Sequence, residues 1–174
     1  MKKLKSTWYN MAIVLTGIAV VAGAALGYVN SITAPTIEAL KVQQEKEAEQ
    51  EVLNGQEGSA IKITDPKGFG GALTVMVGLA QDGTSLGYKV LESSETPGLG
   101  AKAQDWFQKG QKGDIIGKQA GKLEVSKDGG EVDAITASTI TSRAFLRCIN
   151  AAYKTLSEND AQSGASPQAK PNNN

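Results

Sequence analysis

The chain has 174 residues with 18 basic and 18 acidic side chains, so its formal net charge is zero. A balanced charge gives no general reason to expect nucleic-acid binding. The sequence contains no histidine and a single cysteine, Cys148, which excludes His-ligated haem, a His-based zinc site and an intrachain disulfide. One thiol cannot hold an iron–sulfur cluster by itself, so a redox role would need an organic cofactor.

The uncharged segment at residues 11–29, MAIVLTGIAVVAGAALGYV, is typical of a membrane-spanning helix. At about 1.5 Å per residue it covers roughly the 30 Å hydrocarbon core of a bilayer. Trp8, Tyr9 and Tyr28 lie at its ends, where interfacial aromatic residues are common. Three lysines within residues 1–10 predict a cytoplasmic N-terminus and place the remainder of the chain outside.

A cleaved signal peptide is the alternative for this segment, with residues 22–24 as the A-x-A site. Its apolar run is longer than the roughly 7–15 residues usual in such peptides, so we favour an uncleaved anchor. A buried core helix is disfavoured because the segment has no polar face.

Residues 30–54 are predicted to form a stalk outside the membrane. Pro35 suits the first turn of a new helix. The segment from Thr36 to Leu53 is rich in Glu, Gln and Lys with few apolar residues, which is typical of an exposed helix.

Residues 55–156 are predicted to form a small α+β domain with an antiparallel sheet and packed helices. Asp82-Gly83 is a hairpin turn signal, and the apolar spacing of residues 140–156 predicts a helix. The predicted strands are 61–63, 72–80, 86–91, and a further pair at 122–126 and 131–135. The polar segment 157–174 lacks the apolar residues needed to pack and is expected to be disordered.

The segment from Glu95 to Ala103 contains G-x-G-x-x-A, which superficially matches a dinucleotide-binding fingerprint. We reject this interpretation because Pro97 sits where the strand should enter the glycine turn, and no second βα unit with an acidic ribose partner follows. The simpler interpretation is a Pro-Gly turn and a short helix that carries Trp106 and Phe107 as core residues.

The segment from Asp133 to Arg143 concentrates hydroxyl groups before the predicted helix. Five of the seven residues from Thr136 to Ser142 are Ser or Thr. Ordinary N-capping would need only one of them. The free N–H groups of a helix N-terminus also stabilise a phosphate, and Arg143 in the first turn is favourable only beside an anion. The pattern therefore favours a phosphate site over a plain cap.

This segment resembles the flavinylation motif of FMN-binding domain proteins, D-x-x-[ST]-x-x-T-x-[ST]. The matching residues are Asp133, Thr136, Thr139 and Thr141. The remainder is similar to one branch, the G subunit of the Rnf ion-translocating electron-transport complex. The similarity covers the anchor, residues 29–37 and 69–78, ETPGLGAK with Trp106-Phe107, and TASTITSRA. The commonest family core is S-G-A-T, whereas residues 136–139 here read T-A-S-T, so Ala137 removes the backbone freedom of a glycine.

The resemblance implies one FMN, joined by a phosphoester to Thr139. A separate flavin transferase of the ApbE type would attach it, using FAD and Mg²⁺, and would recognise Asp133, Thr136 and Thr139. Leu99 would be the apolar contact to the flavin ring. The implied FMN-binding residues are Glu95, Thr96, Leu99, Gly100, Thr136, Ala137, Ser138 and Thr141; no catalytic side chain and no metal ligand is implied.

The resemblance also implies a redox subunit that is not catalytic alone. It would sit in the cytoplasmic membrane, in contact with lipid and with the other subunits of a complex that passes electrons between reduced ferredoxin and NAD⁺ while moving Na⁺ or H⁺. The C subunit of the Na⁺-translocating NADH:quinone reductase is an alternative, because it uses the same motif. A cofactor-free, membrane-anchored binding or scaffold protein is the alternative from another class.

Overall fold

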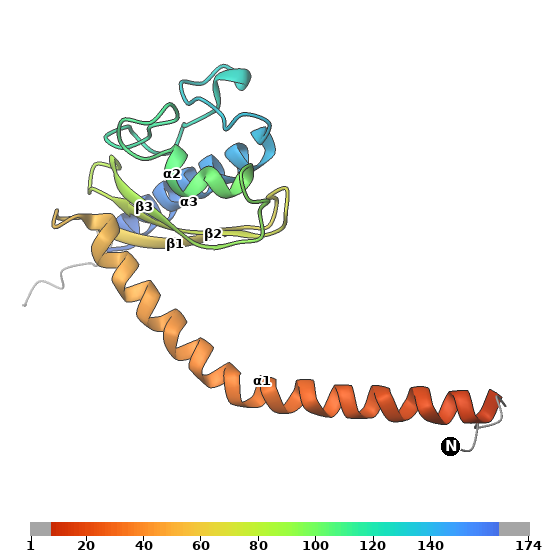
Figure 1. Cartoon of the computed structure of the whole chain (residues 1–174). Coiled ribbons are helices and arrows are strands. Elements are labelled where there is room, and N and C mark those ends of the chain that lie inside the picture. Colours follow the sequence, from red (N-terminus) through yellow and green to blue (C-terminus); the bar gives the residue numbers. More distant parts are fainter. Residues whose placement is uncertain (1–7, 164–174) are drawn as a thin grey trace, which may run out of the picture. The chain divides into compact units, whose positions relative to one another are not determined.

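The structure is a computed structural model that describes residues 8–163, with side chains to Asn159 (Figure 1). It divides into two compact units, residues 1–43 and 44–174, which are described separately. The first seven residues, with the lysines that predict orientation, and residues 164–174 of the predicted tail lie outside the described residues. The elements are α1 (Trp8–Leu53), β1 (Ser59–Asp65), β2 (Leu73–Leu79), β3 (Ser85–Ser93), η1 (Gly100–Lys102), α2 (Ala103–Trp106), η2 (Ser126–Asp128) and α3 (Thr139–Ser163).

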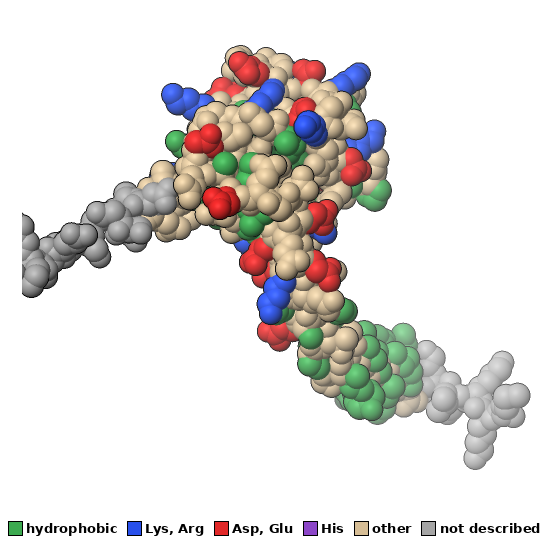
Figure 2. Space-filling view, turned by 90° about the vertical axis from the view of Figure 1, so that its left-hand side faces the viewer, with side chains coloured by type: hydrophobic (Ala, Val, Ile, Leu, Met, Phe, Trp, Pro, Cys, Tyr) green, Lys and Arg blue, Asp and Glu red, His purple; other side chains and the backbone are tan. Residues whose placement is uncertain are grey.

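The described part of the N-terminal unit is the first part of α1, whose side chains are exposed as far as Gln43. Among the described residues, α1 is the one helix long and apolar enough to cross a membrane. Figure 2 shows apolar side chains gathered on its N-terminal part and charged side chains farther along it. A bare apolar surface of this length is unfavourable in water, so the helix fits a membrane anchor.

The prediction of a new helix at Pro35 is wrong, because α1 continues without a break through Pro35 to Leu53. A proline inside a helix removes one backbone hydrogen bond. The bond lost here is the one to the carbonyl of Ser31, four residues earlier.

The last turns of α1 belong to the globular unit, so the prediction of a wholly exposed stalk is wrong for them. Ala48 and Val52 are buried and form a small apolar cluster with Met76 of β2. A Cβ atom on Gly78 would lie 2.3 Å from the carbonyl oxygen of Val52, so this glycine allows the helix to approach the sheet. Salt bridges join Lys62 to Glu45 and Lys89 to Glu51.

The sheet is an antiparallel meander in the order β1-β2-β3. The predicted turn at Asp82-Gly83 is confirmed: the Asp82 carboxylate accepts from the N–H of Thr84 at 2.9 Å, and Gly83 has φ +85°. Every residue of β2 is buried. Its odd-numbered side chains face the main core under α3, whereas Met76 faces the end of α1.

Helix α3 lies along one face of the sheet and supplies the main core (Figure 1). The ring of Phe145 stacks on Phe107 with centroids 4.2 Å apart. Tyr88 donates its hydroxyl hydrogen to the carbonyl of Ala103 at 2.8 Å, and burial raises its pKa. The predicted apolar face of the helix is confirmed; its buried residues are Phe145, Cys148, Ile149, Ala152 and Leu156. The predicted short helix is also present as η1 and α2, with Phe107 fully buried and Trp106 half-buried.

Two predictions on the C-terminal half are wrong. No strand pair forms at 122–126 and 131–135; η2 lies there instead, with a single bridge between Val125 and Val132. Both valines are buried while their neighbours are exposed, so the alternating pattern arises from a loop that packs into the core. Helix α3 also continues to Ser163, so the segment 157–163 is helical and not disordered.

Asp65→Asn is expected to destabilise the domain by about 1–2 kcal/mol at pH 7. Asp65 is buried at the end of β1 and accepts hydrogen bonds from Arg147 Nε at 2.6 Å and from the N–H of Lys67 at 2.7 Å. Burial alone would raise the pKa of Asp65, but the bonds from Arg147 and Lys67 outweigh it and hold the pKa below its ordinary value. The stabilisation is therefore complete above the unfolded-state pKa of about 3.9 and is lost as the pH falls through the folded value.

Thermal unfolding in detergent should thus separate wild type from Asp65→Asn at pH 7, and the difference should shrink as the pH falls through the lowered folded-state pKa of Asp65. Glu158→Gln is the control, because its exposed pair with Lys154 at 4.0 Å should change stability by less than about 0.5 kcal/mol. A difference between wild type and Asp65→Asn that persists unchanged in acid would contradict this assignment.

Candidate functional site

A cavity of about 350 Å³ lies where the loop after β3 meets the N-terminus of α3. It is open to solvent and brings Phe69 together with two segments that are about 40 positions apart in the sequence. The lining residues are Phe69, Glu95, Thr96, Leu99, Gly100, Ala137, Ser138, Thr139 and Ile140. Seven of these nine are among the residues that the sequence suggested for cofactor binding; Thr136, Asp133 and Thr141 are outside the lining.

The loop after β3 is closed by its own backbone. The carbonyl of Thr96 accepts hydrogen bonds from the N–H of Leu99 at 3.1 Å and of Ala101 at 3.3 Å. Gly98 has φ +80°, which only glycine adopts without strain. The turn leaves the side chain of Leu99 about two-fifths exposed at the cavity.

Glu95 has a buried carboxylate, and one of its two oxygens accepts no hydrogen bond among the described residues. Its Oε1 accepts from the N–H of Phe69 at 2.8 Å, whereas Oε2 is buried and has no hydrogen-bond partner among the described residues. A Cβ atom on Gly100 would lie 2.5 Å from Oε2 and 2.8 Å from Thr141 Oγ1, so only glycine leaves room there. A buried carboxylate oxygen without a partner is costly, and a donor on a bound molecule would remove that cost.

The turn before α3 places the hydroxyl groups in two classes. Ser138 Oγ and Thr141 Oγ1 lie 3.1 Å apart and are buried, and Ser142 Oγ donates to the carbonyl of Ser138 and accepts from the N–H of Ile135. Thr139 is only half-buried and lines the cavity, whereas Thr136 is exposed and lies outside the lining.

Ala137 shapes this turn through its backbone. It has φ +61°, the left-handed conformation that costs a residue with a Cβ atom roughly 1–2 kcal/mol. The turn therefore keeps a conformation suited to glycine, although this chain carries alanine there.

The charged groups near Thr139 are arranged differently from the sequence expectation. Arg143 is held by Asp128 in a bidentate pair, with both N···O distances 2.7 Å. The hydrogen bond from Arg143 lowers the pKa of Asp128, and the same bond raises the pKa of Arg143. The group that reaches Thr139 is instead Lys127, whose Nζ donates to Thr139 Oγ1 at 3.3 Å.

Asp133 supports the turn from outside the cavity. Its Oδ1 accepts from Ser126 Oγ at 2.9 Å, and its backbone carbonyl accepts from the indole N–H of Trp106 at 2.8 Å. The side chain therefore fixes η2 relative to the segment that leads into α3.

Comparison with known proteins decides the family. Residues 68–154 match the family described as FMN-binding domain. The G subunit of the ion-translocating oxidoreductase complex of Vibrio atlanticus is 34% identical, over 79% of this chain and 68% of that protein. The G subunit of the Na⁺-translocating ferredoxin:NAD⁺ oxidoreductase complex of Acetobacterium woodii is 30% identical, over 90% of this chain and 98% of that protein. The corresponding G subunit of Salmonella typhi is 40% identical, over 53% of this chain and 47% of that protein.

The chain belongs to the family of these G subunits. The matched range begins at Gly68, beside Phe69, and ends within α3, so both cavity segments lie inside the FMN-binding domain. The prediction of the family is confirmed, and with it the α+β domain behind one apolar helix.

The cavity of the FMN-binding domain suits FMN in three respects. Exposed apolar side chains at its rim, Phe69, Leu99 and Ile140, suit a flat aromatic ring. The free oxygen of Glu95 suits an N–H or O–H donor, and FMN offers a ring N–H and ribityl hydroxyls. The N-terminus of α3 with Lys127 suits a phosphate.

Phe69, Ile140 and Lys127 were not foreseen as site residues. Phe69 is 70% exposed and Ile140 is 49% exposed. The sequence does not reveal this exposure, because an apolar residue before Gly-Gly or at the start of a helix is typical of a core position. Lys127 precedes Thr139 by 12 positions, and the predicted strand pair, which does not form, gave no reason to place its side chain beside Thr139.

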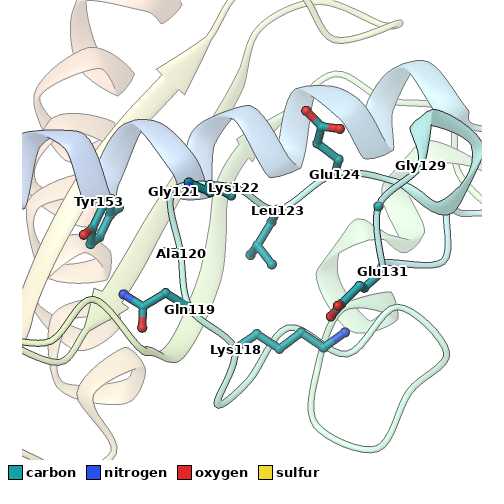
Figure 3. A pocket seen from close by; sticks show the side chains of 11 residues that line it. Lys118, Gln119, Ala120, Gly121, Lys122, Leu123, Glu124, Gly129, Glu131 and Tyr153 are labelled. Atoms are coloured by element: carbon teal, nitrogen blue, oxygen red, sulfur yellow. The ribbon is translucent and has the colours of Figure 1, made fainter.

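The FMN-binding domain also has a larger cavity of about 780 Å³ (Figure 3). Its walls are residues 118–124 and 129–131 with Tyr153 of α3. Figure 3 places Lys118 and Glu131 at one end and Tyr153 at the other. Its charges have both signs and none of its residues belongs to the flavinylation motif, so its size alone does not make it the cofactor site.

Proposed function

We propose that the chain is the membrane-anchored electron-transfer subunit of an Rnf-type complex and carries one FMN esterified through its phosphate to Thr139. The observation that carries the proposal is the cavity that joins the loop at Glu95–Gly100 to the turn at Ala137–Ile140. Bound FMN would supply the redox chemistry, because the flavin and not a side chain carries the electrons in such proteins.

The choice of Thr139 is supported by the state of the neighbouring hydroxyl groups. Ser138, Thr141 and Ser142 are buried and bonded to one another or to the backbone, so a transferase could not reach them without opening the turn. Thr139 lies at the first position of α3 and faces the cavity, where free N–H groups favour a phosphate.

The attachment step is a transfer of FMN from FAD, carried out by a flavin transferase of the ApbE type with Mg²⁺. Thr139 Oγ1 forms a bond to the phosphorus of the FMN half, the pyrophosphate bond breaks, AMP leaves, and the threonine proton passes to a base of the transferase. Asp133 and Thr136 lie beside this turn and are proposed as recognition residues. Asp133 Oδ1 accepts a hydrogen bond from Ser126. Part of the role of Asp133 in recognition is therefore to stabilise the turn that the transferase binds.

The rest of the cofactor is proposed to occupy the cavity. Leu99, with Phe69 and Ile140, would cover the flavin ring, and Glu95 Oε2 would accept a hydrogen bond from it or from the ribityl chain. Thr96, Gly100, Ala137 and Ser138 would contribute the walls. Thr136 and Thr141 act indirectly in this arrangement, because neither lines the cavity.

The complex is proposed from the relatives. The name of the Acetobacterium woodii relative states Na⁺-translocating ferredoxin:NAD⁺ oxidoreductase activity, and we propose that this chain serves a complex of the same kind. It would pass electrons between reduced ferredoxin and NAD⁺ with movement of Na⁺ or H⁺. Its partners would be the other subunits and membrane lipid, and its FMN domain would lie outside the cytoplasmic membrane.

Leu99→Asp is expected to lower the midpoint potential of the flavin while leaving the phosphoester in place. A carboxylate beside the ring disfavours the negative charge gained on reduction by roughly 1 kcal/mol at water-like screening, which corresponds to a shift on the order of tens of millivolts. Because Leu99 is about two-fifths exposed, the change should not unfold the domain. The measurement is a spectroscopic redox titration of the flavin-loaded full chain.

Gln111→Asp is the matched control, since it adds the same charge at an exposed position outside the lining and should leave the potential unchanged. If wild type, Leu99→Asp and Gln111→Asp all carry covalent flavin and have equal midpoint potentials, the flavin ring does not lie beside Leu99 in this cavity.

A further inference from the structure

The turn η2 carries a lysine toward the attachment threonine. Lys127 is the middle residue of this three-residue turn, and its Nζ lies 3.3 Å from Thr139 Oγ1. The contact joins two segments 12 positions apart, so it depends on the fold and not on sequence proximity.

The residues on both sides of Lys127 are tied to the body of the domain. On one side Ser126 Oγ donates to the carbonyl of Val132 at 3.0 Å and to Asp133 Oδ1 at 2.9 Å. On the other side the Asp128 carboxylate forms its bidentate pair with Arg143 of α3. The backbone of Lys127 is therefore anchored twice, which limits the directions that its side chain can take.

The charge of Lys127 is directed at a neutral group. Arg143 forms an ion pair with Asp128, whereas Lys127 donates a hydrogen bond to the hydroxyl oxygen of Thr139. Esterification would turn that hydroxyl oxygen into the bridging oxygen of a phosphodiester with one negative charge. The two non-bridging oxygens on the adjoining phosphorus would then be within reach of the three donors of the ammonium group.

We propose that Lys127 is the cofactor-binding residue for the phosphate of FMN at Thr139. The proposal rests on the proposed function and deepens it. During attachment Thr139 Oγ1 bonds to the phosphorus of the FMN half of FAD, AMP leaves with the electron pair of the broken bond, and the threonine proton passes to the transferase. The Lys127 ammonium stabilises the negative charge at the phosphoryl oxygens in this step and remains paired with the phosphodiester afterwards.

The test compares the full chain in detergent as wild type, Lys127→Gln, Lys127→Arg and Lys122→Gln. Each is incubated with an ApbE-type transferase, FAD and Mg²⁺, and the rate of covalent flavin incorporation is measured. Removal of one preorganised donor predicts a rate for Lys127→Gln that is roughly tenfold or more lower. Lys127→Arg should restore most of the rate. Lys122→Gln removes an exposed lysine of the same segment and should match wild type.

The second readout is the ³¹P resonance of the loaded proteins, which a purely structural role of Lys127 would not move. The phosphodiester resonance of Lys127→Gln should shift from that of wild type, while that of Lys122→Gln should not. Equal thermal unfolding of all four proteins checks the fold.

Equal rates and equal ³¹P resonances for wild type and Lys127→Gln would overturn the proposal while leaving attachment at Thr139 intact. A slow Lys127→Gln with an unchanged ³¹P resonance would assign the lysine to transferase recognition and would also overturn it. A wild type that takes up no flavin would overturn both this proposal and the proposed function, so the two failures are distinguishable.

Discussion

Thr139→Ala is expected to abolish covalent FMN while leaving the domain folded. The side chain is half-buried at the cavity, and its described hydrogen bond is with the exposed Lys127. Losing one such hydroxyl at a helix start costs about 1 kcal/mol. The full chain, expressed together with a flavin transferase, should show flavin fluorescence on a denaturing gel as wild type and none as Thr139→Ala, with closely similar thermal unfolding.

Two matched variants sharpen this result. Thr139→Ser keeps a nucleophilic oxygen and should retain part of the attachment. Ser157→Ala removes an exposed hydroxyl from the same helix and should label fully. Persistent fluorescence of Thr139→Ala would mean that another hydroxyl carries the flavin.

Protease added to intact spheroplasts is expected to digest the chain beyond Ser31 nearly completely. The uncharged span and the lysines before it favour a cytoplasmic N-terminus, and α1 has the length and apolar surface to cross a bilayer. The loss of the FMN domain on a blot, with a cytoplasmic marker protein preserved, measures the orientation. Inside-out vesicles are the control, since the domain should be protected in them.

Protection of the domain in spheroplasts would reverse the proposed orientation. A mature N-terminus near Ala25 would replace the anchor with a cleaved signal peptide. N-terminal sequencing of the membrane fraction separates these two results from the expected one.

The sheet and α3 could be predicted because their signals are local. Asp82-Gly83 fixes the hairpin between β2 and β3, and the apolar spacing from Phe145 to Leu156 fixes the buried face of the helix. The wrong predictions of secondary structure concern segments whose conformation depends on tertiary packing. Val125 and Val132 alternate with polar residues as in a strand, but they are buried from a loop, and α1 tolerates Pro35 in its interior.

The cavity was predictable in part because a motif, and not a periodicity, marked its two segments. Glu95, Leu99 and Thr139 could be named from the resemblance, and the structure brings them to one cavity. The free oxygen of Glu95 and the contact from Lys127 depend on the depth of burial and on the path of a loop. Neither property has a local signature in the sequence, so both required the fold.

The most direct test of covalent FMN at Thr139 is mass spectrometry of wild-type protein expressed together with a flavin transferase. The intact mass should exceed that of the bare chain by one FMN less one water, and the protein should have the visible spectrum of a flavin. Trypsin should place the adduct on the peptide of residues 128–143, and fragmentation should localise it to Thr139. A bare intact mass, or an adduct on any other residue, would contradict the assignment.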